Sequence, residues 1–274
     1  MTHRRRGVLI THIVLLIGSF IMLFPFVWMI LTSFKTQGES IMVPPIIFPT
    51  HWDLTNYSEV LRTLPFDALY INTILLIFWR VVCATLFCSM AGFAFAKLEF
   101  PGKKLCFFIV LTQLMLPGQV FIIPQYLMLA KLNQLNSIFA LVFPGLVSAF
   151  GTFFLRQFYM GLPNDLSEAA RLDGCNTWQT FIRILMPLTK TALMALAVFT
   201  AVFAYGDMMW PLIVNMNIDK MTLSAGISSL QGQYSTKYPI MMAGSALAMI
   251  PMMVLYLFFQ RQFIEGIALT GTKA

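Results

Sequence analysis

The chain reads Glu168-Ala169-Ala170-Arg171-Leu172-Asp173-Gly174 and, after nine further residues, Ile184-Leu185-Met186-Pro187. This polar stretch lies between two long hydrophobic segments. The Gly161-Leu162-Pro163 sequence ends the preceding helix, because proline cannot continue a helix and disfavours α geometry in the residue before it. A short helix is then expected from about Asn164 to Leu172, and Asp173-Gly174 ends it, since glycine readily adopts positive φ. The stretch therefore predicts a stiff hook with small side chains on part of its surface.

A second helix is expected in the same loop. It begins at Asn176, where Gln179 three residues later completes a capping-box pattern. It would carry apolar side chains such as Trp178 and Phe181 into the next hydrophobic segment. Taken alone, the hook also fits an amphipathic connector that lies on a membrane surface.

The composition places most of the chain in a lipid bilayer. Of its 274 residues, 58% are hydrophobic and 11% are charged, whereas soluble domains carry roughly a quarter charged residues. A helix needs about 20 apolar residues to cross a bilayer. Six runs qualify, at about residues 7–34, 68–96, 105–130, 132–155, 191–218 and 238–260. Each must be helical in lipid, where backbone polar groups need partners within the segment.

The first run, which follows His3-Arg4-Arg5-Arg6, resembles a secretory signal peptide. It is too long for one, however, and no small-residue cleavage site ends it. We therefore interpret it as a retained first span.

Basic residues at the segment ends predict the orientation. With six spans, four regions share one side of the membrane, and all four are basic. They contain Arg4, Arg5 and Arg6; Lys97, Lys103 and Lys104; Arg156, Arg171, Arg183 and Lys190; and Arg261 and Lys273. Both termini and the hook are therefore expected in the cytoplasm. The basic residues behind the net charge of +7 thus lie at the ends of the hydrophobic segments rather than along one face of a helix, which argues against nucleic-acid binding.

The hook matches a family motif at six positions. The Glu-Ala-Ala triplet, Gly174, Ile184 and Pro187 have the spacing of the EAA loop of ABC importer permeases, and Met186 replaces the usual leucine. The chain resembles this family over nearly its whole length, and most of all the smaller permease of maltose-type carbohydrate importers. Further matches lie at residues 112–117, 210–212, 230–234 and 260–266. The resemblance implies an all-α integral membrane protein with six transmembrane helices, the type I ABC importer permease fold and a cytoplasmic coupling helix.

The resemblance also implies a domain organisation and a place in an assembly. A first transmembrane helix with an outer loop spans residues 1–67, the ABC transporter transmembrane type-1 domain spans 68–261, and a cytoplasmic tail spans 262–274. The assembly would lie in the bacterial inner membrane, in contact with lipid. It would contain a second homologous permease, two cytoplasmic ATPase subunits, an external solute-binding protein and a sugar substrate.

The residues implied to couple the chain to the ATPase are Glu168, Ala169, Ala170, Arg171, Asp173 and Gly174. The chain has no G-x-x-x-x-G-K-[ST] phosphate-binding loop. ATP and Mg are therefore expected on the partner ATPase. This chain is expected to bind no cofactor and to be no enzyme.

Arg80 and Asp207 are the full charges deep within the hydrophobic runs. A charge near the bilayer centre costs about 2.5–3.5 kcal/mol on insertion scales, so it normally faces protein or water. Asp207 could face the pore and bind sugar hydroxyls, or it could be a buried partner, even of Arg80. Arg80 could also pair with the other permease. Tyr205 and Trp210, which flank Asp207, could stack on a sugar ring or pack between helices.

The last outer loop, about residues 215–238, is expected to contact the binding protein. The residues that the resemblance assigns to this contact are Gln231, Gly232, Gln233 and Tyr234. The glutamine and tyrosine side chains can form hydrogen bonds, and the glycine lets the backbone bend into a partner's cleft. An ordinary solvated loop is the alternative.

The leading hypothesis for function is a permease for a carbohydrate. Relatives often carry a Trp-Asn pair before an acidic residue where this chain has Tyr205-Gly206-Asp207, so no particular sugar can be transferred. A permease for glycerol-3-phosphate or a polyol is one alternative, although a phosphate favours several pore-facing cations. An integral-membrane enzyme is another, although no His, Cys or carboxylate cluster lies in the spans. The cysteines lack metal-ligand spacing, so no metal site is expected; they are Cys83, Cys88, Cys106 and Cys175.

Overall fold

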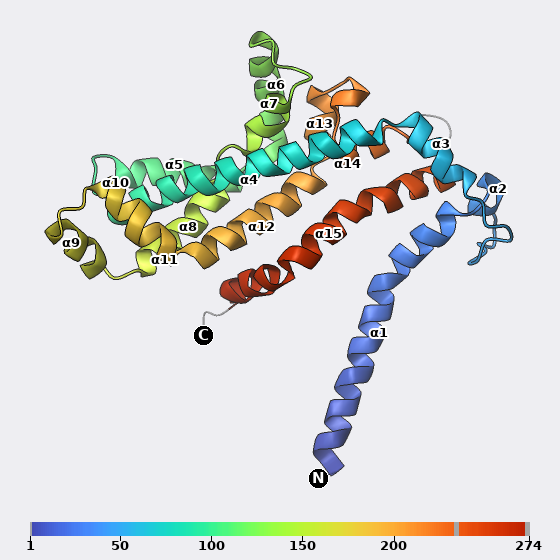
Figure 1. The fold of residues 1–274 in the computed structure, drawn as a ribbon, viewed down its shortest axis with the longest axis horizontal. Coiled ribbons are helices and arrows are strands. Elements are labelled where there is room, and N and C mark those ends of the chain that lie inside the picture. Colours follow the sequence, from blue (N-terminus) through green and yellow to red (C-terminus); the bar gives the residue numbers. More distant parts are fainter. Residues whose placement is uncertain (1, 233–235, 272–274) are drawn as a thin grey trace. The chain divides into compact units, whose positions relative to one another are not determined.

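The computed structural model describes residues 2–232 and 236–271, and the side chains of residues 8, 10–232 and 236–261. Helices make up the regular structure of this part of the chain (Figure 1). They are α1 (Thr2–Ser33), α2 (Gln37–Ser40), α3 (Thr55–Thr63), α4 (Phe66–Lys97), α5 (Lys103–Met115), η1 (Gly118–Phe121), α6 (Ile122–Lys131), α7 (Ile138–Val142), η2 (Phe143–Gly145), α8 (Ala149–Gly161), α9 (Asp165–Leu172), α10 (Thr177–Gln179), η3 (Thr180–Leu185), α11 (Met186–Leu188), α12 (Lys190–Gly206), α13 (Met209–Val214), η4 (Ile218–Lys220), α14 (Leu223–Ser228) and α15 (Tyr238–Gly271).

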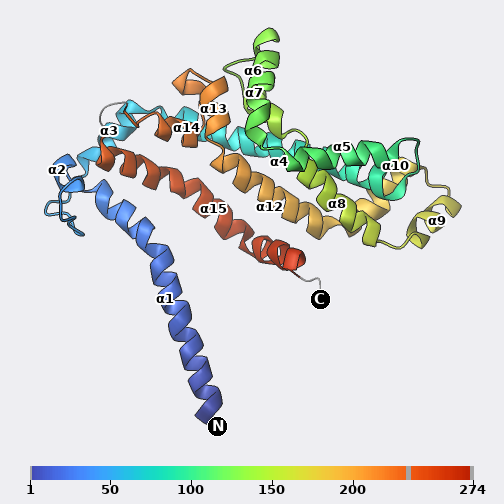
Figure 2. The same cartoon turned by 180° about the vertical axis from the view of Figure 1, so that it is seen from behind.

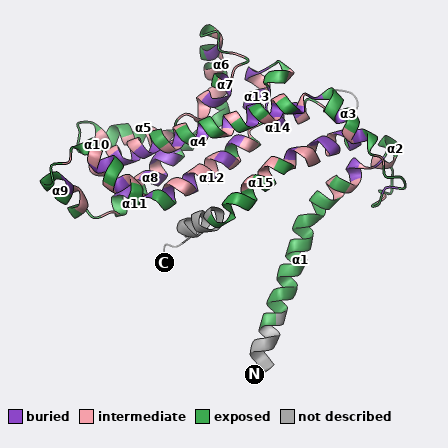
Figure 3. Cartoon of the chain, in the orientation of Figure 1, coloured by how far each residue is buried: buried purple, intermediate pink, exposed green. Residues whose placement is uncertain are grey.

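Three of these helices, α1, α4 and α15, are long and apolar enough to cross a membrane unbroken. Three bent pairs also have the required length and composition, so the described residues hold three spans, or up to six if each pair counts as one. The six-helix expectation is therefore met when each pair is one span. Side chains along α1 are exposed through most of its length, as a helix surrounded by lipid requires (Figure 3).

The third, fourth and fifth predicted spans differ from the straight helices that the hydrophobic runs suggest. The third bends by 106° between Met115 and Gly118, and the fourth by 48° between Gly145 and Ala149. A further bend of 77°, at Thr189, lies just before the fifth run. Pro117 accounts for the first break, because it lacks the N–H that would continue the ladder. In the fifth run α12 ends at Gly206, and the separate helix α13 follows, so the run to residue 218 is not one helix.

The chain divides into two compact units. The first holds residues 1–66 and 227–250, and the second holds residues 67–226 and 251–274.

A buried lysine organises the loop that follows α1 in the first unit. Lys35, which is 1% exposed, donates from Nζ to the Ile46 carbonyl at 2.7 Å and lies 4.3 Å from the centre of the Trp28 ring. The buried Asn56 donates to the carbonyls of Ser33 and Lys35, each at 3.0 Å. These bonds tie the loop to the end of α1.

Glu39 closes the same loop. Its carboxylate accepts hydrogen bonds from the side chain and backbone N–H of Thr50 and from the backbone N–H of Thr36. The bonds from Thr50 and Thr36 lower the pKa of the Glu39 carboxyl to about 2. The carboxylate therefore stays charged, and the loop stays closed, far below neutral pH.

Two apolar clusters hold the second unit together. One gathers α4, α8, η3 and α12 around the fully buried side chains of Leu155, Tyr159 and Leu185. The other joins α4, α6, α7 and α13 around Leu76, Leu129 and Leu141. The backbones of α4 and α8 approach so closely that a Cβ on Gly92 would lie 2.9 Å from the backbone nitrogen of Arg156. Figures 1 and 2 both show α9 at one end of this unit, beyond α8 and α10.

Candidate functional site

An ion pair joins the two charged residues of the hydrophobic runs. Arg80 Nη1 lies 2.9 Å from Asp207 Oδ2, with side chains 9% and 23% exposed. Arg80 also donates to the Leu141 carbonyl from Nε at 3.2 Å and from Nη2 at 2.6 Å. Gly145 packs on the aliphatic part of Arg80, where a Cβ would lie 2.6 Å from Cδ. Arg80 thus finds its partner within this chain, which is the buried-partner arrangement that the sequence left open.

The two aromatic residues near Asp207 differ in their surroundings. Trp210 is 5% exposed, belongs to the second apolar cluster and donates from Nε1 to the Ala140 carbonyl at 2.8 Å. These contacts are those of a side chain that packs between helices. Tyr205 is partly exposed, and its backbone carbonyl accepts a hydrogen bond from Ser224 at 2.6 Å. A sugar contact by Tyr205, Asp207 or Trp210 stays a prediction.

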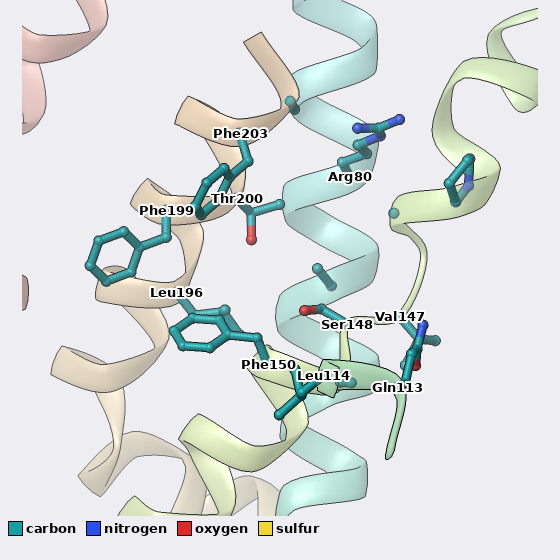
Figure 4. Close-up of a pocket in the computed structure, with 15 residues that line it drawn as sticks. Arg80, Gln113, Leu114, Val147, Ser148, Phe150, Leu196, Phe199, Thr200 and Phe203 are labelled. Carbon is teal, nitrogen blue, oxygen red and sulfur yellow. The ribbon is translucent and has the colours of Figure 1, made fainter. Parts of the chain in front are cut away.

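A cleft of about 330 Å³ opens beside Arg80. Figure 4 shows Phe150, Leu196, Phe199 and Phe203 on one side of this space and Gln113, Val147 and Ser148 on the other. Thr200 of α12 adds a hydroxyl. The walls thus combine amide and hydroxyl groups with aromatic faces, the combination that binds polar molecules with apolar faces.

The sequence interpretation missed this cleft, because Tyr205, Asp207 and Trp210 do not line it. Two signals were available. Gln113 is a polar residue within an apolar run, and Phe199 and Phe203 lie four residues apart on one face of a helix. Gln113 is exposed and Phe203 is 71% exposed. Since exposed polar groups at membrane depth normally face protein or water, this surface is not expected to face lipid.

The hook has the geometry that its sequence predicts. The helix α9 ends at Leu172, and Gly174, which follows the C-cap residue Asp173, has a φ of +81°. The Gly174 N–H donates to the Arg171 carbonyl at 3.0 Å, and the Cys175 N–H donates to the Ala170 carbonyl at 2.9 Å. This pair of bonds is the Schellman motif, which satisfies the last carbonyls of a helix and favours glycine at this position.

The surface of α9 is unevenly exposed. Glu168, Ala169, Arg171 and Asp173 are exposed, Leu172 is 90% exposed, and Ala170 is 2% exposed. Ala170 is therefore a contact within this chain, whereas the other members of the predicted docking set are accessible to a partner. The predicted capping box is also present, with Asn176 and Gln179 exchanging bonds of 2.9 and 2.8 Å.

Two sets of contacts fix the hook to the membrane helices. At its start, Lys97 of α4 donates to the Leu162 carbonyl at 2.6 Å and to Asn164 Oδ1 at 2.7 Å. At its end, η3 is a π-helix, a rare form that is frequently found at functional sites. The 77° bend follows η3 and α11, at Thr189.

The bend at Thr189 is held by a buried chain of hydroxyl groups. Tyr159 of α8 is fully buried. Its hydroxyl lies 2.6 Å from the Ser89 hydroxyl of α4 and accepts a bond from the Thr189 hydroxyl at 3.3 Å. The Thr189 hydroxyl also donates to the Met186 carbonyl at 2.9 Å. Because satisfied polar networks in a low dielectric are rigid, these bonds tie Thr189 firmly to α4 and α8.

The predicted binding-protein contact is only partly within the described residues. Gln231 and Gly232 are exposed, and the Gln231 N–H donates to the Ser228 carbonyl at 3.1 Å. Gln233 and Tyr234 lie outside the described residues. Beyond them Lys237 pairs with Glu59 of α3 at 2.8 Å.

Comparison with known proteins identifies the family. Residues 84–268 match the family described as "Binding-protein-dependent transport system inner membrane component". The chain belongs to this family. It is 33% identical to the arabinooligosaccharides transport system permease protein AraQ of Halalkalibacterium halodurans, a match that covers 93% of this chain and 92% of that protein.

Other relatives carry other substrate names. The sn-glycerol-3-phosphate transport system permease protein UgpE of Salmonella typhi is 32% identical, over 97% of this chain and 98% of its own length. The diacetylchitobiose uptake system permease protein NgcG of Streptomyces coelicolor is 28% identical, over 98% of this chain and 89% of its own.

The fold has a counterpart among solved structures. A chain of a bacterial ABC transporter involved in the import of the acidic polysaccharide alginate superposes with a TM-score of 0.78, at 21% identity, over 94% of this chain and 97% of that one. That likeness concerns the fold. The chain is thus the inner-membrane permease component of an ABC importer, not itself an enzyme, and it works with an ATPase and a binding protein.

Proposed function

We propose that this permease forms half of the translocation pathway of an ATP-driven importer for a neutral sugar or oligosaccharide. A second homologous permease supplies the other half, two cytoplasmic ATPase subunits hydrolyse ATP, and an external binding protein delivers the substrate. Both termini and the hook lie in the cytoplasm, as the basic residues at the segment ends indicate. The residue ranges 1–67, 68–261 and 262–274 keep the roles that the sequence predicts.

The hook is the proposed contact through which the ATPase subunits move the permease. Glu168, Ala169, Arg171, Asp173 and Gly174 present an exposed surface, and Ala169 and Gly174 have side chains small enough for close approach by the ATPase. Lys97 of α4 holds the start of the hook at Leu162, and the Tyr159 hydroxyl of α8 holds its end at Thr189. Closure of the ATPase pair therefore displaces α9 together with the helices that line the cleft, rather than bending the loop alone.

We propose the substrate class from the charge of the cleft. Among the residues that the structure describes, Arg80 is the one charged residue that lines it, and Asp207 already neutralises Arg80 at 2.9 Å. A phosphate binds where arginine or lysine supplies charge-assisted hydrogen bonds. Gln113, Ser148 and Thr200 instead offer neutral hydrogen-bonding groups that suit sugar hydroxyls. The names of the AraQ and NgcG relatives support a saccharide, while that of UgpE keeps glycerol-3-phosphate as the alternative.

The test is ATPase stimulation of the assembled complex in proteoliposomes, with its cognate binding protein. We expect a neutral oligosaccharide, from a panel that includes arabino-oligosaccharides and diacetylchitobiose, to stimulate hydrolysis, and glycerol-3-phosphate to have no effect. Gln113→Ala should lower sugar uptake roughly 2- to 12-fold, the value of one neutral hydrogen bond. Gln134→Ala, an exposed glutamine outside the cleft, is the matched control. Stimulation by glycerol-3-phosphate alone would overturn the substrate class.

A further inference from the structure

A second and larger cavity lies where α4 ends and α5 begins. It measures about 820 Å³, and it is separate from the cleft beside Arg80, with which it shares no lining residue. The residues that define it are Phe95, Glu99, Lys103, Lys104, Phe108 and Arg156. Nothing in the proposed transport mechanism uses this cavity.

Positive charge dominates the cavity. It contains three cations, Lys103, Lys104 and Arg156, against the single carboxylate of Glu99. Lys103 is already paired within the cavity, because its Nζ lies 2.9 Å from Glu99 Oε1 and 2.7 Å from the Leu98 carbonyl oxygen. Among the residues that the structure describes, no carboxylate lies within 4.0 Å of Lys104 or Arg156. Two cations in the cavity are therefore uncompensated.

The arginine is held in position by its neighbours rather than neutralised by them. Arg156 donates from Nε to the Phe95 carbonyl at 3.2 Å, and its guanidinium carbon lies 4.1 Å from the centre of the Phe107 ring. Phe95 and Phe107 pack on each other with ring centroids 5.3 Å apart. These contacts fix the plane of the guanidinium and leave its terminal nitrogens for an anion, which a planar fork binds through two oxygens.

The cavity lies where two candidate membrane segments meet. It is formed by the last residues of α4 and the first of α5, both of which are segments of candidate spans. Lys103 and Lys104 begin α5, where no side chain caps the helix, and cations at a helix N-terminus oppose the helix dipole. Leu105, the next residue of α5, and Phe108, about one turn further on, are each 63% exposed. A basic pocket thus opens directly onto apolar side chains.

We propose that this cavity binds the headgroup of an anionic phospholipid such as phosphatidylglycerol. The phosphate is held by Arg156 and Lys104, and an acyl chain lies along Leu105 and Phe108. Basic pockets between transmembrane helices at the cytoplasmic surface are suited to such headgroups. The apolar exit distinguishes a lipid from free phosphate, which would gain nothing from Phe108. This inference does not depend on the substrate of the importer.

The test measures lipid retained by the assembled importer. The complex is extracted from membranes and exchanged into nanodiscs that contain equal parts of phosphatidylglycerol and phosphatidylcholine. It is then washed with detergent, and the lipid that it retains is measured by mass spectrometry. We expect wild type to retain phosphatidylglycerol preferentially. Lys104→Gln should lower this preference about fivefold, and Lys104→Gln with Arg156→Gln about 25-fold, since each basic residue near the surface contributes about a factor of five. Lys190→Gln, which removes an exposed charge at the start of α12, is the control.

Two results would overturn the proposal. One is an unchanged preference in Lys104→Gln and in the double variant, relative to Lys190→Gln. The other is complete displacement of the retained lipid by millimolar inorganic phosphate, which would identify a free-anion site. Lys104 is exposed, so its single variant stays informative even if the loss of Arg156 prevents assembly.

Discussion

Replacement of Gly174 by valine is expected to abolish uptake while the membrane domain still folds. The φ of +81° at Gly174 is left-handed, and no heavy atom of the described residues, other than those of its two chain neighbours, lies within 4 Å of the position that a Cβ would occupy. A Cβ at this position therefore meets no other segment of the described chain. The substitution costs at least about 1–2 kcal/mol through the disfavoured backbone angle, and it opens the Schellman bonds that end α9. The readouts are sugar uptake by proteoliposomes and co-purification of the ATPase.

Two further variants separate backbone conformation from contact with the partner. Gly174→Asn tolerates a left-handed angle, so it should recover part of the uptake if only the conformation matters. If it fails as completely as Gly174→Val, the ATPase needs the space that glycine leaves. Gly38→Val, at a second glycine with no atom within 4 Å of its Cβ position, is the control in the outer loop. Normal uptake and normal ATPase association by Gly174→Val would show that the hook is not the coupling element.

Arg80→Met is expected to remove most of the assembled permease from the membrane. The methionine keeps much of the side-chain volume but leaves Asp207 without its partner at 2.9 Å. Removal of one member of a buried ion pair costs about 3–5 kcal/mol, because the remaining charge is uncompensated. The amount of folded protein after detergent extraction, with its thermal unfolding midpoint, measures the loss.

The double variant tests whether the pair is structural. Arg80→Met with Asp207→Leu removes both charges, and buried ion pairs are often replaced by apolar residues without loss of stability. We expect it to restore assembly, with a coupling energy between the two sites in a double-mutant cycle. An Arg80→Met permease that assembles at the wild-type level would mean that Asp207 has another source of compensation.

The hook is the part of the fold that could be predicted from sequence in most detail, because its signals are local. Asp173-Gly174 indicates a left-handed helix end, and Gly174 has that conformation. Asn176 and Gln179, three residues apart, indicate a capping box, and both of its bonds are present. Each of these features is decided by residues within one helical turn, so neither depends on how the rest of the chain packs.

The breaks in the spans and the cleft depend on contacts between distant residues. Pro117 shows in the sequence that a helix must end there, but the 106° bend depends on where α6 packs. Arg80 and Asp207 are 127 positions apart, and no periodic pattern links them. The π-helical turn at Thr180–Leu185 likewise has no sequence signal that we can identify. The cleft is assembled from α4, α5, α8 and α12, so its aromatic and amide walls become visible only in the folded structure.

Photo-cross-linking from the hook tests the coupling role of α9 most directly. A benzophenone side chain at Leu172, which is 90% exposed, should not disturb the fold of this chain. In the assembled importer it should cross-link to the ATPase subunit, and the yield should change when ATP closes the ATPase pair. The same group at Ser58, exposed on α3 in the outer loop, should not reach the ATPase. An ATPase cross-link from Ser58 and none from Leu172 would contradict both the orientation of the chain and the coupling role of the hook.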